Sequence, residues 1–171
     1  MIDNIRYLKN TSSGETGFEI ASRLHRWGHD VTIVAGETNH YPKYKMPLII
    51  KCPDPDEMLK ELLALSKCDI DVWIHAAAVL DYINQDVNYS KIPSGKDNIS
   101  FSLSKSKKHI SELADYCKDS FRIGFKLESG ITLKQLITKS SSFVENNELN
   151  VVVANRLEDL KDKSKNRAHL I

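Results

Sequence analysis

The sequence has 171 residues, 41% of them hydrophobic and 27% charged, which is enough to build one globular domain around a single core. Lysine and arginine total 24 and aspartate and glutamate total 23, so the formal charge of +1 gives no electrostatic reason to expect nucleic acid or an anionic membrane as a partner. No apolar run reaches the length of a membrane span, and the three cysteines have no metal-ligand spacing. We therefore expect a soluble, cytoplasmic protein.

Strand patterns and helix patterns alternate along the chain. The expected elements are, in chain order, a short extended piece at 5–8, a helix at 13–27, strands at 30–35 and 48–51, a helix at about 58–65, a strand at 71–76, an irregular stretch at 77–98, a strand at 99–103, a helix at 108–117, a strand at 122–126, a helix at 132–146, a strand at 151–154, a polar tail at 158–167 and an edge strand at 168–171. Near-continuous apolar strands separated by helices are typical of a parallel sheet covered on both faces. The sequence therefore predicts one α/β domain over residues 1–171, with a Rossmann-like, doubly wound, mostly parallel sheet and helices on both faces.

The stretch from Asn10 to Gly17 has the composition of an anion-binding helix start. Small hydroxyl residues and two glycines lead directly into the first apolar positions of the helix. The first N–H groups of a helix have no intrahelical partner and carry partial positive charge, while Gly14 and Gly17 let a phosphate or carboxylate approach the backbone. Short glycine motifs also occur where a residue such as Ser12 or Ser13 only caps a helix, so both interpretations stay open.

Further candidate positions follow from the rule that a doubly wound sheet binds ligands beyond the carboxyl ends of its strands. The alanines at 76–78 can form a floor for a ligand, and Asp81 can accept hydrogen bonds or help to hold a cation; alternatively, the alanines only allow close packing and Asp81 starts a turn. The same rule selects residues 124–126 and 154–155. Lys91, on the long connection after the alanines, either swings its charge onto phosphate groups or is simply solvated.

Five ordered motifs lie at or near these strand ends. They are Ile-Asp-x-x-Arg-Tyr-x-x-Asn-x-Ser-Ser-Gly-x-x-Gly at 2–17, Ala-Ala-Ala-Val-x-Asp-Tyr at 76–82, Lys-Ile-Pro-Ser-Gly at 91–95, Gly-Phe-Lys-x-Glu at 124–128 and Val-Ala-Asn at 153–155. With these motifs the chain resembles, over almost its whole length, the phosphopantothenoylcysteine synthetase family, the second activity of the bifunctional coenzyme A biosynthesis protein of many prokaryotes. The third and fourth motifs resemble the archaeal branch of that family.

The resemblance implies a ligase that joins 4'-phosphopantothenate to L-cysteine. A nucleoside triphosphate, CTP or less often ATP, activates the pantothenate carboxylate as an acyl-nucleotidylate with loss of pyrophosphate, and the cysteine amine then displaces the nucleoside monophosphate. The resemblance also implies Mg²⁺ held mainly by phosphate and water, no metal ligands from the protein, and no FMN in this chain.

The resemblance also assigns roles to individual residues. Asn10 is expected to hold the activated acyl group, and Lys91 to neutralise phosphate charge; these two are the expected catalytic residues. The residues expected to bind phosphopantothenate are Arg6, Asn10, Ala77, Ala78 and Asp81, and those expected to bind the nucleotide are Ser12, Gly14, Gly17, Asp81, Lys91, Phe125 and Asn155. Arg6 matches an arginine that reaches the phosphate bound by a neighbouring subunit, which implies a homodimer with shared sites. The apolar side chains of segment 83–93 favour the same packing against a second copy, unless that segment folds back as a lid.

The chain also departs from the family. Family members begin with a further strand and a glycine-rich turn before the motif at Ile2, and this sequence starts after them, so a partner chain is expected to supply the strand. Lysines found in bacterial members have no clear counterpart around residues 143–147, and Lys139 is the nearest substitute. Two alternatives stay open: a catalytically impaired nucleotide-binding remnant or partner subunit, and a nicotinamide-binding Rossmann protein. No Gly-x-Gly-x-x-Gly follows a first strand, which speaks against the second.

Overall fold

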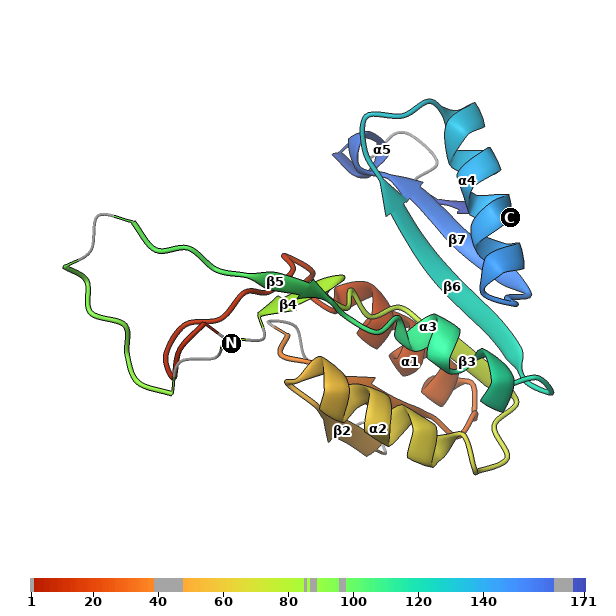
Figure 1. Cartoon of the computed structure of the whole chain (residues 1–171). Coiled ribbons are helices and arrows are strands. Elements are labelled where there is room, and N and C mark those ends of the chain that lie inside the picture. The colour runs from red at the N-terminus through yellow and green to blue at the C-terminus, as the bar shows by residue number, and fades with distance from the viewer. Residues whose placement is uncertain (1, 39–47, 85, 87–88, 96–97, 162–167) are drawn as a thin grey trace.

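The structure, a computed structural model, describes residues 2–38, 48–84, 86, 89–95, 98–161 and 168–171. Its elements are α1 (Glu15–Arg26), β1 (Thr32–Ala35), β2 (Leu48–Lys51), α2 (Pro55–Leu65), β3 (Val72–His75), β4 (Tyr82–Asn84), β5 (Leu103–Lys105), α3 (His109–Glu112), the 3-10 helix η1 (Ala114–Tyr116), β6 (Phe121–Glu128), α4 (Leu133–Asn146), β7 (Val151–Arg156), α5 (Leu157–Lys161) and β8 (His169–Leu170). Figure 1 shows α4 lying along β6 and β7, and the β4–β5 hairpin leading into a long extension that points away from the helices.

The strands are mostly parallel, as predicted. β1 and β2 form one parallel pair. In a second sheet, β3, β6 and β7 are parallel neighbours, and β8 adds an antiparallel strand at the edge. The α/β, Rossmann-like class is therefore confirmed. The difference is that the parallel strands of the described residues form two sheets, because β1 and β3 do not pair with each other.

The side-chain alternation along the strands decides which helices cover which face. Trp73 lies opposite Arg122, and His75 lies opposite Gly124, so these positions share one face of the sheet. On that face Trp73 packs with apolar residues of α2 and of the turn that follows α3. A Cβ atom at Gly124 would come within 2.7 Å of Leu149 Cδ1 and 3.3 Å of atoms from α3 and α4, so glycine is the residue that lets these helices approach the strand.

Two predicted boundaries are wrong for local reasons. The helix expected to begin at about residue 58 begins at Pro55. The Asp54 carboxylate caps this helix by accepting N–H groups of its first turn at 2.9 and 3.3 Å. Residues 5–8 form no strand. The Asp3 carboxylate accepts the N–H groups of residues 5 and 6 at 2.9 and 2.8 Å, and these hydrogen bonds stabilise a turn at the start of the segment.

The middle of the chain also differs from the prediction. The stretch 77–98 contains β4, which pairs antiparallel with β5, and the strand expected at 99–103 begins only at Leu103. The helix expected at 108–117 is two short pieces, α3 and η1. The tail at 158–167 begins within α5, and its later part, like most of the loop at 37–47, lies outside the described residues.

Arg122 ties β6 to two helices from inside the core. Its side chain is 2% exposed, yet it faces backbone carbonyls rather than a carboxylate. Its guanidinium donates to the carbonyls of Asn147 at 2.7 Å, Glu148 at 3.2 Å and Ile110. These carbonyls lie at the end of α4 and in α3, so one buried side chain satisfies polar groups that the helices leave unpaired.

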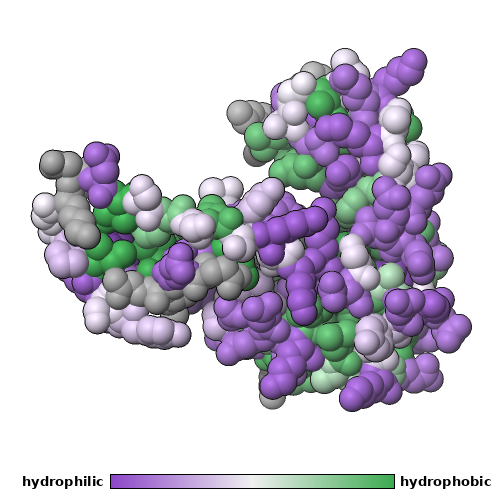
Figure 2. Space-filling view, in the orientation of Figure 1, coloured by the Kyte–Doolittle hydropathy of each residue, from purple (hydrophilic) through white to green (hydrophobic). Residues whose placement is uncertain are grey.

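The extension, which we call the arm, consists of residues 82–105 with the N-terminal segment 2–8 beside it. Several large apolar side chains along it are exposed, and Figure 2 shows hydrophobic patches among polar side chains on the part of the molecule that projects outward. Tyr89, for example, is 83% exposed. Among the helices that the structure describes, none combines the length and apolar content needed to cross a membrane.

We expect His75 to make the fold sensitive to acid. Burial lowers the pKa of His75 to about 4, and the charges of Arg122 and His109 act in the same direction. In the unfolded chain that pKa is about 6.5. Between pH 6.5 and 4 the His75 imidazole is therefore protonated in the unfolded state but not in the folded state. The contribution of His75 to the free energy of unfolding is complete above pH 6.5 and is lost as the pH falls towards 4.

The measurement is urea unfolding between pH 7.5 and pH 4.5. His75→Gln should make the free energy of unfolding fall less steeply over this range than in the wild type. His25→Gln, on the exposed side of α1, is the control and should keep the wild-type slope. Equal slopes for His75→Gln and the wild type would contradict the assignment.

Candidate functional site

The first turn of α1 sits between the ends of two strands that do not pair with each other. Gly14, the residue before α1, has φ of +80°, and a Cβ atom there would lie 2.9 Å from Cγ2 of Thr38, just beyond β1. A Cβ atom at Gly17 would lie 3.7 Å from the Cβ of Ala76, just beyond β3. The helix start is thus placed at the carboxyl ends of β1 and β3, where parallel sheets bind ligands.

The loop before this helix start is attached to the alanine segment. The side-chain amide of Asn10 donates to the carbonyl of Ala78 at 2.8 Å and, less closely, to that of Val79 at 3.4 Å. Ser13 accepts the N–H of Glu15 at 3.2 Å. No side chain caps the helix at Gly14 itself. The structure therefore brings Asn10, the glycines and the alanines together, although 68 residues separate the two partners of the Asn10 bond.

Arg6 lies beside the arm in a network centred on Asp3. The Asp3 side chain is fully buried and accepts the Arg6 Nε–H at 2.9 Å and the Ile92 N–H at 3.1 Å. Arg6 also donates to the Ile92 carbonyl at 3.0 Å. The Arg6 guanidinium holds the pKa of Asp3 well below its usual range, so the carboxylate stays charged. Because the Arg6 side chain is about half exposed, it can still contact a further anion.

Most of the remaining predicted residues are exposed. Ala77 and Asp81 are exposed beyond β3, and the Asp81 carbonyl accepts the N–H of Ser106 at 2.8 Å. Lys91 is exposed on the arm, next to the residue that Asp3 binds. Ser12 is exposed in the loop before α1.

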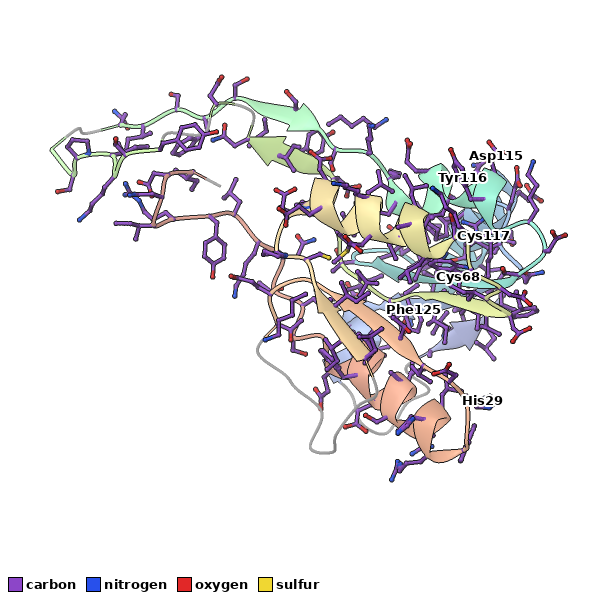
Figure 3. The ribbon with its side chains drawn as sticks, turned by 90° about the horizontal axis from the view of Figure 1, so that it is seen from below. His29, Cys68, Asp115, Tyr116, Cys117 and Phe125 are labelled. Atoms are coloured by element: carbon purple, nitrogen blue, oxygen red, sulfur yellow. The ribbon has the colours of Figure 1, made fainter. Side chains whose placement is uncertain are left out.

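Phe125 and Asn155 share a face of the second sheet. Phe125 lies opposite Val153 and Leu127 opposite Asn155, so their side chains point to the face away from α4. Figure 3 shows Phe125 in the strand layer, between the arm at one end of the molecule and the group formed by Cys68, Asp115, Tyr116 and Cys117 at the other.

The opposite face carries a charged group, in which Lys126 and Glu128 of the Gly-Phe-Lys-x-Glu motif pair with each other and with Lys139 of α4. Glu128 Oε1 lies 3.0 Å from Lys126 Nζ, and its Oε2 lies 3.0 Å from Lys139 Nζ. These side chains line a groove of about 400 Å³ between β6 and α4. A Lys-x-Glu pair at a strand end places both side chains on one face, and this was the signal available in the sequence.

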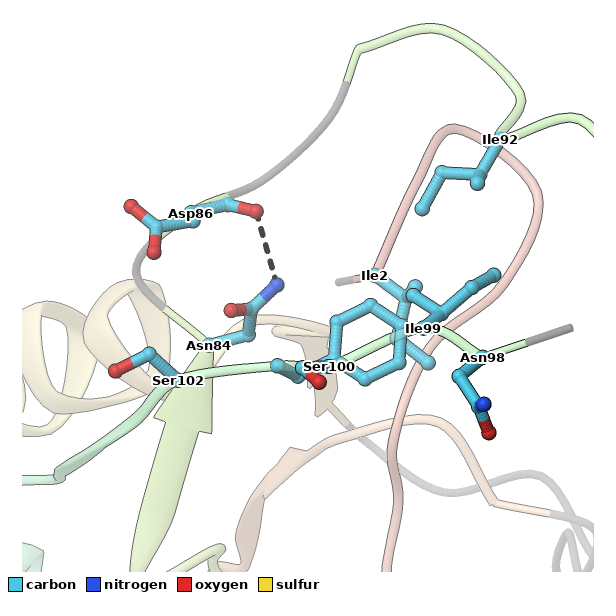
Figure 4. A pocket seen from close by; sticks show the side chains of 9 residues that line it. Ile2, Asn84, Asp86, Ile92, Asn98, Ile99, Ser100 and Ser102 are labelled. Atoms are coloured by element: carbon cyan, nitrogen blue, oxygen red, sulfur yellow. Dashed lines mark hydrogen bonds between the residues drawn. The ribbon is translucent and has the colours of Figure 1, made fainter. Parts of the chain in front are cut away.

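A second cavity, of about 290 Å³, lies within the arm and away from the helix start. Figure 4 shows Ile2, Ile92 and Ile99 on one side of it, and Asn84, whose amide donates to the Asp86 carbonyl at 3.1 Å, on the other. None of the residues predicted to bind substrate or nucleotide lines this cavity. No group of three or more metal-binding side chains occurs among the described residues.

Comparison with known proteins connects this geometry to a family. A family model described as DFP, the DNA/pantothenate metabolism flavoprotein C-terminal domain, matches residues 1–171. The chain is 33% identical over 173 residues to the coenzyme A biosynthesis bifunctional protein CoaBC of Borreliella burgdorferi, covering 100% of this chain and 43% of that protein. It is 30% identical over 159 residues to the CoaBC of Methanocaldococcus jannaschii, covering 91% and 38%. The chain thus spans about two fifths of the length of these relatives.

Solved structures share the fold. The DNA/pantothenate metabolism flavoprotein from Streptococcus pneumoniae matches with a TM-score of 0.85 and 22% identity, covering 100% of this chain and 86% of that one. The C-terminal domain of a CoaBC matches with a TM-score of 0.74 and 24% identity, covering 90% and 70%. A complex of the Cab2 mutant H337A with phosphopantothenate-cysteine matches with a TM-score of 0.73 and 15% identity, covering 99% and 75%.

We expect position 14 to tolerate no side chain. Gly14→Ala combines a strained positive φ with a Cβ atom 2.9 Å from Thr38, so it should lower the free energy of unfolding by about 2–3 kcal/mol. Two controls separate the backbone strain from the steric contact. Gly28 has a φ of +91°, but a Cβ atom there would have no other atom within 4 Å, so Gly28→Ala tests the strain alone. Gly95→Ala introduces neither a strained φ nor a close contact. Urea unfolding should rank the losses Gly14, then Gly28, then Gly95. A Gly14→Ala loss no larger than that of Gly28→Ala would show that contact with Thr38 does not matter.

Proposed function

Because the chain belongs to the DNA/pantothenate metabolism flavoprotein C-terminal domain family, we propose that it joins 4'-phosphopantothenate to L-cysteine in coenzyme A biosynthesis. The observation that carries this proposal is the Asn10–Ala78 bond, since it fixes an amide beside the exposed N–H groups of a helix start. The same site could not serve a nicotinamide cofactor through the usual glycine fingerprint, which the sequence lacks.

The proposed reaction has two steps. The pantothenate carboxylate attacks the α-phosphorus of CTP or ATP, forming an acyl-nucleotidylate and releasing pyrophosphate. The cysteine amine then attacks the acyl carbon, forms the amide and releases the nucleoside monophosphate. Both steps need positioning and neutralisation of charge more than a strong base.

The residues have distinct parts in this proposal. The α1 start with Ser12, Gly14 and Gly17 binds phosphate oxygens through backbone N–H groups. Asn10 holds the activated acyl group, and Lys91 supplies positive charge from the arm. Ala77, Ala78 and Asp81 line the phosphopantothenate and nucleotide sites, and Phe125 and Asn155 contact the base and sugar.

Mg²⁺ is proposed to arrive bound to the triphosphate. In this proposal the cation is held mainly by phosphate and water oxygens, and the exposed carboxylate of Asp81 is available to it. Its chemistry there is to neutralise triphosphate charge. Cys52, Cys68 and Cys117 are free thiols, which fits the reducing cytoplasm that we propose as its location.

The proposal is tested by mixing the chain with 4'-phosphopantothenate, Mg²⁺ and CTP, ATP or NAD, with and without cysteine. We expect pyrophosphate release with CTP or ATP, and amide product only when cysteine is present. Nucleotide binding without pyrophosphate release would favour a non-catalytic remnant or partner subunit, and binding of NAD alone would favour the nicotinamide alternative.

The Lys91 role can be tested by removing its charge. Lys91→Gln should slow pyrophosphate release about tenfold or more, because a lost charged hydrogen bond to phosphate costs about 1.5–3 kcal/mol. Lys107→Gln, an exposed lysine after β5, is the matched control and should leave the rate unchanged. Equal rates for the two variants would remove Lys91 from the site.

We further propose that a strand from outside the 171 residues lies between β1 and β3. Among the described residues, β1 pairs only with β2 and β3 only with β6, so each leaves one edge open. The α1 start touches the residues just beyond both strands, which places it at the carboxyl end of the vacant position. A parallel strand there would join the two sheets, and it would need apolar side chains on both faces.

Amide hydrogen exchange tests this proposal. Fusing a six-residue strand of valine and isoleucine with a glycine-rich turn ahead of residue 1 should slow exchange in β1 and β3 by about tenfold or more, because their edges become paired. A glycine-serine extension of the same length is the control, and exchange in the β4–β5 hairpin should not change. If both extensions leave β1 and β3 equally unprotected, the position is not a strand site.

The active sites are proposed to be shared in a homodimer formed by the arm. The arm exposes large apolar side chains on an extended segment, and a second copy is the occupant that would bury them in an isologous contact. Arg6, beside the arm, could then reach the phosphate bound at the Asn10 site of its partner.

Mixing two inactive variants tests the shared site. Arg6→Ala and Asn10→Ala should each be nearly inactive, but refolding them together should recover about a quarter of wild-type activity, since half of the random dimers are mixed and each has one intact site. Asp3 keeps three backbone N–H partners in the Arg6 variant. A monomer by sedimentation, or no recovery in the mixture, would reject the shared site.

A further inference from the structure

Three buried side-chain nitrogen atoms near the end of β3 have no hydrogen-bond partner among the described residues. They are Nε of Arg122, Nδ1 of His109 and Nε2 of His75. The side chains of Arg122 and His109 are 2% and 6% exposed. Buried polar atoms in proteins are almost always hydrogen-bonded, so these nitrogens point to a ligand that pairs with them.

The three side chains lie on the face of the second sheet that α3 covers. Trp73 lies opposite Arg122, and His75 follows Trp73 by two residues on the same face, so His75 and Arg122 are diagonal neighbours. His109 begins α3, and the carbonyl of the next residue, Ile110, accepts a hydrogen bond from Arg122. Burial lowers the pKa of His75, and the charges of Arg122 and His109 add to this effect, so the three side chains are near enough to act on one another.

This group carries a positive charge that no buried anion balances. Among the described residues, the guanidinium of Arg122 donates to backbone carbonyls and forms no ion pair. Cys117 and Glu148 are the groups whose negative charge would oppose it. Burial raises the pKa of the Cys117 thiol, which keeps it neutral, and the Glu148 side chain is exposed. Because a buried charge without a counterion is unfavourable, a small anion would be stabilised beside Arg122.

His109 determines when such an anion can bind. Its ring is hydrogen-bonded to the Pro55 carbonyl through the nitrogen other than Nδ1, so Nδ1 of the neutral ring carries a lone pair that repels an anion. Protonation turns Nδ1 into a donor. Burial lowers the pKa of His109, while the Pro55 carbonyl and the carboxylates of Asp56 and Glu112 raise it. His75 can donate from Nε2 in its neutral form, so one proton is sufficient.

We infer that Arg122, His109 and His75 form a buried site for a monovalent anion of the size of chloride, which binds together with one proton. Each side chain contributes one N–H donor, and the proton goes to Nδ1 of His109, whose new charge the anion balances. Because His75 directly precedes the alanines at 76–78, the anion would lie beneath the segment to which Asn10 is attached. This site does not depend on the proposed ligase activity.

Thermal unfolding in sodium chloride and in sodium gluconate, each at about 150 mM, tests the site, because both salts screen charge equally but gluconate is too large to enter it. At pH 5 the midpoint should be higher in chloride by about 4 °C, and at pH 7.5 the two midpoints should agree. His109→Gln should abolish the difference at pH 5, because glutamine cannot take up the proton. His29→Gln, at an exposed position after α1, is the matched control and should keep the difference.

Bromide gives a second measurement, which does not depend on a variant that folds. It has nearly the size of chloride, and its anomalous scattering locates it in a crystal. Crystals of the wild-type chain soaked in sodium bromide at pH 5 should show bromide between the nitrogens of Arg122, His109 and His75. Equal midpoints in the two salts at pH 5, a chloride effect that persists in His109→Gln, or bromide at the molecular surface only would each overturn the site.

Discussion

The contact of the first turn of α1 with the ends of β1 and β3 is the constraint on which the candidate site depends. Gly14 leaves no room for a side chain beside Thr38, and Gly17 meets Ala76 at ordinary contact distance. Because the helix starts there, its unpaired N–H groups face the edge at which parallel strands end. The Asn10 amide donates to the carbonyl of Ala78 and, less closely, to that of Val79, and it thereby links the loop to the segment after β3.

The arm is connected to this constraint through a single buried carboxylate. Asp3 accepts hydrogen bonds from its own turn and from Ile92, so it joins the N-terminal segment to the arm. The loop that carries Asn10 begins immediately after that turn. A partner that packs on the arm would therefore act directly on the position of Asn10, which gives a physical reason to connect assembly with activity.

Much of the fold and part of the site could be predicted from local patterns. The strands with apolar runs and α4 were predicted correctly because short apolar runs and the 3.6-residue repeat can be recognised from neighbouring residues alone. The start of α2 was predicted too late because it was taken from the first apolar positions of the repeat, although Asp54 followed by Pro55 is a helix-start signal. The β4–β5 hairpin was missed because its pairing depends on contacts between distant segments, and Arg122 could not be placed in the core by its residue type.

The sequence by itself determined the alternation of strands and helices, the glycines of the helix start and the order of the motifs, because each depends on residues close together in the chain. Only the tertiary structure decided which motifs meet. The Asn10–Ala78 bond and the Asp3–Ile92 bond join segments separated by 68 and 89 residues. The pairing of Lys126 and Lys139 on Glu128 depends on how α4 packs against β6, and the open edges of β1 and β3 depend on strand order. Packing and strand order are set by long-range contacts, which local patterns do not contain.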